Sequence, residues 1–266
     1  LGDPLVELGE EGAIVTGSLQ LGSGATLALL SPFFLEALRR AGGMGVGILS
    51  LPVYAAIVMS GHQSSAVLAL IGLAGWTMLA LRNKEVGAKR QVTGFVISAI
   101  IGLLLGVYLS VVTGQVSTLA EAPARYQSFL YQSQLWELSW QAFMDHWLTG
   151  VGMRGFGTYA LATDASTIPG LAETWHSHLT ILEVISETGL VGLIGYGLLL
   201  RWLWGYVQDD RMHVAVAGLT ALLAVFPLGT AVGMYSYIGG NLIFLTFTLL
   251  IALDRDCPHV TETSAL

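Results

Sequence analysis

Seven long apolar stretches dominate this sequence, and they restrict the chain to a fold that lies in a membrane. Each stretch is close to the length of about 20 residues that an α-helix needs to cross a bilayer core. Only 11% of the 266 residues are charged, whereas a soluble domain carries about 25%. We therefore predict an all-α, polytopic transmembrane helix bundle of about seven spans, with one long outer loop that contains amphipathic helices. The spans are expected at residues 22–38, 43–60, 64–82, 92–113, 178–206, 213–230 and 236–253.

The basic residues predict how these spans are oriented. Nine of the eleven fall on one side of a seven-span topology, and the positive-inside rule makes that side cytoplasmic. The other two, Arg125 and Arg154, fall in the long loop on the opposite side. The chain then divides into residues 1–113 with four spans, a periplasmic loop at 114–177, and residues 178–266 with three spans and a cytoplasmic tail. Because the chain starts without Met and without a basic signal-peptide region, we expect further spans upstream.

The outer loop contains a helical pattern of its own. Four aromatic residues recur at helical spacing and form one stripe: Trp136, Trp140, Phe143 and Trp147. Such a helix suits the membrane interface, or its stripe packs on the protein's own spans, and both interpretations are open. The "GVGMRGFG" stretch that follows contains a G-x-G-x-x-G pattern, but no strand precedes it. We interpret it as a turn with close backbone approach and not as a nucleotide site.

Two histidines stand where the fifth span begins. A helix over 178–206 would be about 43 Å long, against a hydrocarbon core of about 30 Å, so its histidine end should project beyond the outer leaflet. His176 and His178 are two residues apart and point in different directions on a helix. Because no Cys or further His lies nearby to complete a ligand set, we predict no metal site.

Acidic residues and glycines follow within the same span. An acid inside a span is costly and suggests a function; the alternative for Glu187 is a hydrogen bond to the outer loop. Gly189, Gly192 and Gly195 are expected to let another helix approach closely.

Several motifs together carry a resemblance to a known family. They are the helix and turn "LWELSWQAFMDHWLTGVGMRGF", the segment "HSHLTILEVISETGLVG", the stretch "SGHQSSAVLAL" at 60–70 and the later "FPLGTAVGMYSYIGG". These motifs resemble those of the O-antigen ligase and O-antigen polymerase family of polytopic bacterial membrane proteins. His178, Glu187 and Gly189 fall on the family pattern in register. Two arginines of the family appear here as Gln63 and Gln132.

The resemblance implies a membrane glycosyltransferase in the bacterial inner membrane whose active face is periplasmic or extracellular. The donor would be a glycan linked to undecaprenyl pyrophosphate, and the acceptor a hydroxyl on lipid A-core, another glycan or a protein. Membrane lipid would surround the protein, with no metal, other cofactor or nucleic acid involved. His178 would act as the general base. Arg125 and Arg154 would bind the pyrophosphate, with His176, Glu187, Gln63 and Gln132 in supporting roles.

Two other functions remain open. A small-anion transporter should place polar groups in the middle of the membrane on broken helices, and the interiors of four predicted spans carry no charge. A catalytically silent assembly partner of a polysaccharide export system is consistent with Gln63 and Gln132, because glutamine brings no charge to a phosphate.

Overall fold

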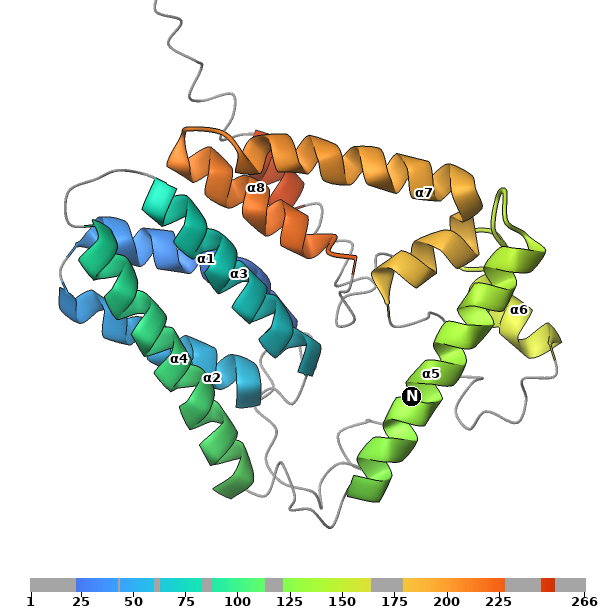
Figure 1. Cartoon of the computed structure of the whole chain (residues 1–266), viewed down its shortest axis with the longest axis horizontal. Coiled ribbons are helices and arrows are strands. Elements are labelled where there is room, and N and C mark those ends of the chain that lie inside the picture. Colours follow the sequence, from blue (N-terminus) through green and yellow to red (C-terminus); the bar gives the residue numbers. More distant parts are fainter. Residues whose placement is uncertain are drawn as a thin grey trace, which may run out of the picture.

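The computed structural model describes residues 23–42, 44–59, 63–82, 88–112, 122–163, 179–227 and 245–251. These residues form helices joined by turns, as Figure 1 shows. No strand occurs among them, so the all-α prediction is confirmed for this part of the chain.

Four helices precede the outer loop. They are α1 (Ser23–Ala41), α2 (Ser50–Met59) with the 3-10 turn η1 (Met44–Leu49) before it, α3 (Gln63–Arg82) and α4 (Ala88–Val112). The outer loop supplies α5 (Ala122–Asp145) and α6 (Phe156–Ala162). The chain continues with α7 (Thr180–Val207) and α8 (Met212–Ala224), and residues 245–251 are also helical. Most of these helices begin and end within a few residues of the predicted spans, because long apolar runs define helix limits well.

Three helical stretches in the described part of the chain are long and apolar enough to cross a bilayer. They are Ser65–Arg82, Gln91–Val112 and Thr180–Val207. Two shorter apolar stretches, Gly47–Met59 and Met212–Ala224, accompany them. The arrangement of seven spans stays a prediction.

The core of the bundle lies between α1, α2, α3, α4 and α8. Trp76 is fully buried there and meets Phe95 edge to face, with ring centroids 5.7 Å apart. Helices α2 and α4 approach each other closely because α4 has glycine where they cross. A Cβ on Gly102 would lie 2.4 Å from the carbonyl oxygen of Leu51, and one on Gly106 2.7 Å from that of Ala55. This pair of glycines four residues apart is the small-residue contact that membrane helices use.

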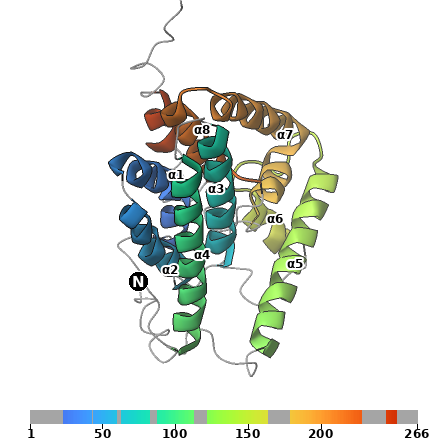
Figure 2. The same ribbon diagram turned by 60° about the vertical axis from the view of Figure 1, so that its left-hand side comes forward.

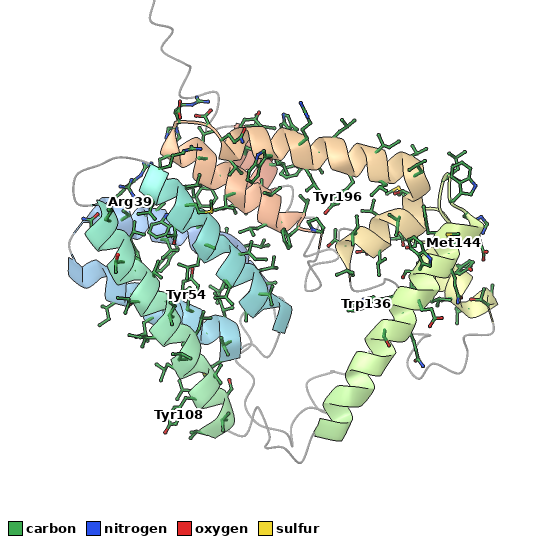
Figure 3. All side chains as sticks on the ribbon, in the orientation of Figure 1. Arg39, Tyr54, Tyr108, Trp136, Met144 and Tyr196 are labelled. Carbon is green, nitrogen blue, oxygen red and sulfur yellow. The ribbon has the colours of Figure 1, made fainter. Side chains whose placement is uncertain are left out.

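Basic residues gather at one end of this bundle. Glu36 is buried and bonds both Arg39 and Arg40, with N–O distances of 2.9 Å. The Arg82 guanidinium donates to the carbonyl of Asp209, whose carboxylate pairs with Arg211 at 2.9 Å. Figure 3 shows Arg39 at this end and Tyr108 at the opposite end of α4. The end of α1 and the turn after α7 therefore each contain ion pairs, and the end of α3 is hydrogen-bonded to that turn. The sequence predicts such basic residues at the cytoplasmic face.

Helix α5 stands apart from α1–α4 and contacts α6 and α7, as Figure 2 also shows. The buried side of α5 packs against Phe156 and Ala160 of α6. This side consists of Leu135, Leu138, Ser139 and Ala142. The aromatic stripe predicted from the sequence does not face this contact. Trp140 is 52% exposed and Trp147 is 55% exposed, so the interpretation that the stripe packs on the protein's own spans is wrong for these two residues.

The α2–α4 contact yields a first prediction. Gly102→Ala should lower the midpoint of thermal unfolding in detergent, because the added methyl overlaps the backbone of Leu51; overpacking of this kind destabilises by about 1–3 kcal/mol. Gly94→Ala is the matched control, since no atom lies within 4 Å of a Cβ at that position of the same helix. Equal unfolding midpoints for the two variants would contradict this account of the contact.

Candidate functional site

Helix α7 is sharply bent at Gly189, whose backbone angles (φ 63°, ψ −155°) are not helical. A straight helix would separate Ile181 and Tyr196 by about 22 Å. Both residues nevertheless bond the end of α8. The Ile181 N–H donates to the carbonyl of Pro227 at 3.0 Å, and the Tyr196 hydroxyl donates to that of Val225. Residues 180–188, which we call the arm, therefore fold back on α8, as Figure 1 shows.

This bend corrects the predicted straight helix over 178–206. The part of α7 after the bend, residues 190–207, is about 27 Å long at about 1.5 Å per residue, which is close to the thickness of a bilayer core. The arm does not project beyond the membrane in line with this span, because it turns back at Gly189. A glycine in an apolar run gives no sequence signal that distinguishes a packing contact from a bend.

The bend releases two backbone N–H groups that a straight helix would satisfy. The turn at residues 146–155, which we call the outer turn, accepts both of them. Leu190 donates to the carbonyl of Trp147 at 2.8 Å, and Val191 donates to that of Leu148 at 3.2 Å. The chain after the bend is thus hydrogen-bonded to the end of α5.

The bend also releases the two carbonyl groups that would have accepted these bonds. The outer turn satisfies them in the same way. Val151 donates its N–H to the carbonyl of Ser186 at 2.9 Å, and Gly152 donates to that of Glu187 at 3.0 Å. The outer turn therefore replaces both sides of the broken helical hydrogen bonds.

Glycines make this backbone contact sterically possible. A Cβ on Gly150, which has φ +67°, would lie 2.2 Å from the carbonyl carbon of Glu187. One on Gly189 would lie 2.5 Å from that of Leu148. The interpretation of "GVGMRGFG" as a turn with close backbone approach is confirmed. The expected partner of Gly189 is corrected: the outer turn approaches it, and not another helix.

The carboxylate of Glu187 holds the second half of the outer turn. Only 1% of this residue is exposed, and its Oε2 accepts the N–H of Arg154 at 2.9 Å. The N–H of Phe156 also bonds the carboxylate. The prediction that Glu187 hydrogen-bonds the outer loop is thus confirmed. A buried carboxylate needs such partners, because an uncompensated charge is very costly away from water.

The same contact limits what the outer turn offers to a ligand. Successive N–H groups in a turn of this kind form a site for an anion, and here the carboxylate of Glu187 already occupies it. The backbone N–H groups of Arg154 and Phe156 are therefore already bonded to this carboxylate. The side chain of Arg154 is exposed instead, on a backbone with φ 58°.

A polar contact that sequence reasoning missed lies beside the outer turn. The Tyr159 hydroxyl donates to Oδ2 of Asp145 at 2.5 Å, and the ring of His146 meets the Tyr159 ring edge to face at 6.2 Å. Burial and the Asp145 carboxylate together raise the pKa of Tyr159 to about 12. This contact joins α5 to α6. Nothing in the sequence links Asp145 to a tyrosine 14 residues later.

Only some of the predicted site residues have side chains that the structure describes. It brings Arg154 and Glu187 together. Arg125 and Gln132 belong to α5 and Gln63 begins α3, but their side chains lie outside the described part. His176 and His178 also lie outside the described residues. Within those residues, no group of three His, Cys, Asp or Glu side chains is placed to hold a metal ion.

Comparison with known families identifies the class of protein. A family model described as O-antigen ligase matches residues 45–197, which is more than half of the chain. The chain belongs to the O-antigen ligase family. It is a multi-pass membrane protein of polysaccharide biosynthesis, with the general ligase or polymerase type of activity that this family has. The match includes the outer turn, the arm and Gly189. No curated protein and no solved structure matches the chain.

The bend yields a second prediction. Gly189→Ala should detach the outer turn from α7, because the new Cβ meets the backbone of Leu148 and because these backbone angles cost a non-glycine residue about 1–3 kcal/mol. The measurable results are a lower unfolding midpoint in detergent and faster trypsin cleavage after Arg154. Gly197→Ala is the control on the same helix, since nothing lies within 4 Å of a Cβ there. Unchanged cleavage in Gly189→Ala would show that the outer turn does not depend on the bend.

Proposed function

We propose that this chain transfers a glycan from undecaprenyl pyrophosphate to an acceptor hydroxyl at the outer face of the bacterial inner membrane. Family membership supports the class of reaction. The observation that supports our choice of this site is the hydrogen bond between Glu187 and the backbone of Arg154. The arm that contains Glu187 begins two residues after His178 in the sequence. A candidate base and a candidate cation are therefore attached to the two ends of one short helical segment.

The residues suggest the following transfer step. His178 takes the proton of the acceptor hydroxyl, whose oxygen forms a bond to the anomeric carbon of the donor glycan. The bond between that carbon and the pyrophosphate oxygen breaks, and its electron pair leaves with undecaprenyl pyrophosphate. Arg154 stabilises the negative charge that develops on this leaving group. Arg125 is the second candidate cation for it, with His176, Gln63 and Gln132 as supporting residues of the donor site.

The topology that we propose places this site outside the cytoplasm. Seven spans would leave residues 114–177 in the periplasm, together with the outer turn. The basic residues Arg39, Arg82 and Arg211, which gather at one end of the bundle, support a cytoplasmic location for that end. The lipid-linked donor and its acceptor would then meet at the outer leaflet. The acceptor would be a hydroxyl on lipid A-core, another glycan or a protein.

The bend in α7 does not favour the transporter alternative. Transporters use broken helices because the released backbone groups are free to bind ions or substrate. Here the outer turn accepts or donates to all four released groups, two N–H and two carbonyl. At these four groups the broken helix is bonded to the outer turn, where a transporter would bind its substrate or ion.

The role of Arg154 gives a third prediction. Arg154→Asn should lower kcat/KM for the lipid-pyrophosphate donor by about 10–100-fold, the equivalent of about 1.5–3 kcal/mol for a hydrogen bond to a charged group. Asparagine tolerates the left-handed backbone at this position, so the outer turn should stay intact. Arg154→Lys should lose less, because it keeps the charge but not the bidentate geometry. Met153→Ala, an exposed neighbour in the same turn, is the control.

These variants would be assayed by glycan transfer in proteoliposomes that contain the purified chain and a lipid-linked donor. Full activity of Arg154→Asn would remove Arg154 from the proposed donor site. Equal losses in Arg154→Asn and Met153→Ala would mean that the turn, and not the charge, is what matters.

The role of His178 gives a fourth prediction. His178→Gln keeps a hydrogen-bonding side chain that cannot accept a proton at neutral pH, so transfer should fall by about 10²–10⁴-fold, the usual contribution of a general base. Donor binding should change little, because the base acts on the acceptor. His176→Gln should be milder, since it does not share a helical face with His178. Near-normal transfer by His178→Gln would show that His178 has a structural role only.

A further inference from the structure

The exposed surface of α5 is divided lengthwise into an apolar and a polar half. At about 100° per residue, Trp140 lies on one side of the face opposite the α6 contact and Gln141 on the other, about 100° apart, with Met144 and Glu137 between them. All four residues are exposed, with Trp140 at 52% and Met144 at 58%. A helix that is buried on one side and exposes both an apolar and a polar strip suits a boundary between lipid and water.

The apolar strip continues beyond the end of α5. Trp147 and Leu148 in the outer turn are 55% and 49% exposed. Their carbonyls accept the N–H groups of Leu190 and Val191, which are the first residues of α7 after the bend. Figure 3 shows Met144 close to this bend, at the end of α5. The outer end of a membrane-length helix and the apolar end of α5 are therefore in direct contact.

Helix α7 extends the same exposed surface along the span. Its exposed apolar residues after the bend include Val191, Ile194 and Leu198, which are 60%, 57% and 63% exposed. In a helix of this length and composition such residues face lipid. The strip on α5 and the outer turn is thus continuous with a surface that contacts the hydrocarbon core.

We propose that the end of α5 and the start of the outer turn lie in the interfacial layer of the outer leaflet. Trp140, Met144, Trp147 and Leu148 contact lipid, while Glu137 and Gln141 face water. The occupant of this surface is the bilayer and not another protein chain, because the strip adjoins the outer end of α7, whose exposed side is apolar and long enough to cross the hydrocarbon core. Two of the four residues are tryptophan, the side chain that is most enriched at this depth of a membrane.

This location has a consequence for the outer turn. Its backbone is bonded to α7 on one side and, through α5, it is held by side chains in the lipid interface on the other. The height of the turn above the hydrocarbon core is therefore fixed at two points. The inference concerns contact with lipid only, so it stands or fails independently of the proposed transfer reaction.

Spin labelling of the full chain tests the inference. Nitroxide labels would be attached at Met144→Cys and, as the matched control, at Gln141→Cys, with the single native Cys257 replaced by serine. The protein would be reconstituted in vesicles of phosphatidylethanolamine and phosphatidylglycerol. Collision rates with oxygen, which concentrates in lipid, and with a water-soluble nickel chelate would be measured at both sites. We expect a several-fold higher oxygen-to-nickel ratio at position 144 than at 141.

Each outcome decides the question. Equal access of the nickel chelate to both labels would place the whole face in water and overturn the proposal. A strongly immobilised label at 144 that neither reagent reaches would mean that protein covers the strip, which would also overturn it. If Met144→Cys does not fold, Trp140→Cys in the same strip takes its place, with the same expected contrast to Gln141→Cys.

Discussion

The exchange of backbone hydrogen bonds at Gly189 is the interaction on which the outer part of this structure depends. A helix that bends sharply near a membrane exposes N–H and carbonyl groups, and each unsatisfied group costs several kcal/mol away from water. The outer turn replaces the lost partners on both sides of the bend. A loop joined to a span in this way cannot leave without exposing all four groups again. The contact therefore behaves as part of the helix and not as a flexible connection.

Glu187 shows how the same contact organises charge. Its carboxylate occupies the position that an external anion would take in a turn rich in N–H donors. The chain thus supplies its own anion, and this fixes the left-handed backbone at Arg154. The N–H of Arg154 is directed inward to Glu187, while its side chain is exposed. One buried acid thereby holds the backbone of the turn.

The sequence predicted those features that depend on local pattern. Apolar length fixed the limits of α3 and α4, and the glycines of the outer turn indicated close backbone approach. The bend at Gly189 was missed because its partners lie about 40 residues earlier in the chain, and the local sequence reads as one apolar helix. The direction of Trp140 was also undecided, because helical spacing groups residues on a face without stating what that face contacts. The pairing of Arg154 with Glu187 depends on the same distant contact.

The way in which Arg154 is held suits the departures of this chain from its family. Glutamine stands at positions 63 and 132, where the resemblance leads us to expect arginine, so the proposed pyrophosphate site contains fewer cations. The backbone of Arg154 is held by its own N–H bond to Glu187, at a φ angle of 58°. Loss of charge at positions 63 and 132 therefore leaves the backbone of Arg154 where it is. In the transfer that we propose, the backbone of the outer turn therefore sets the position of the Arg154 charge.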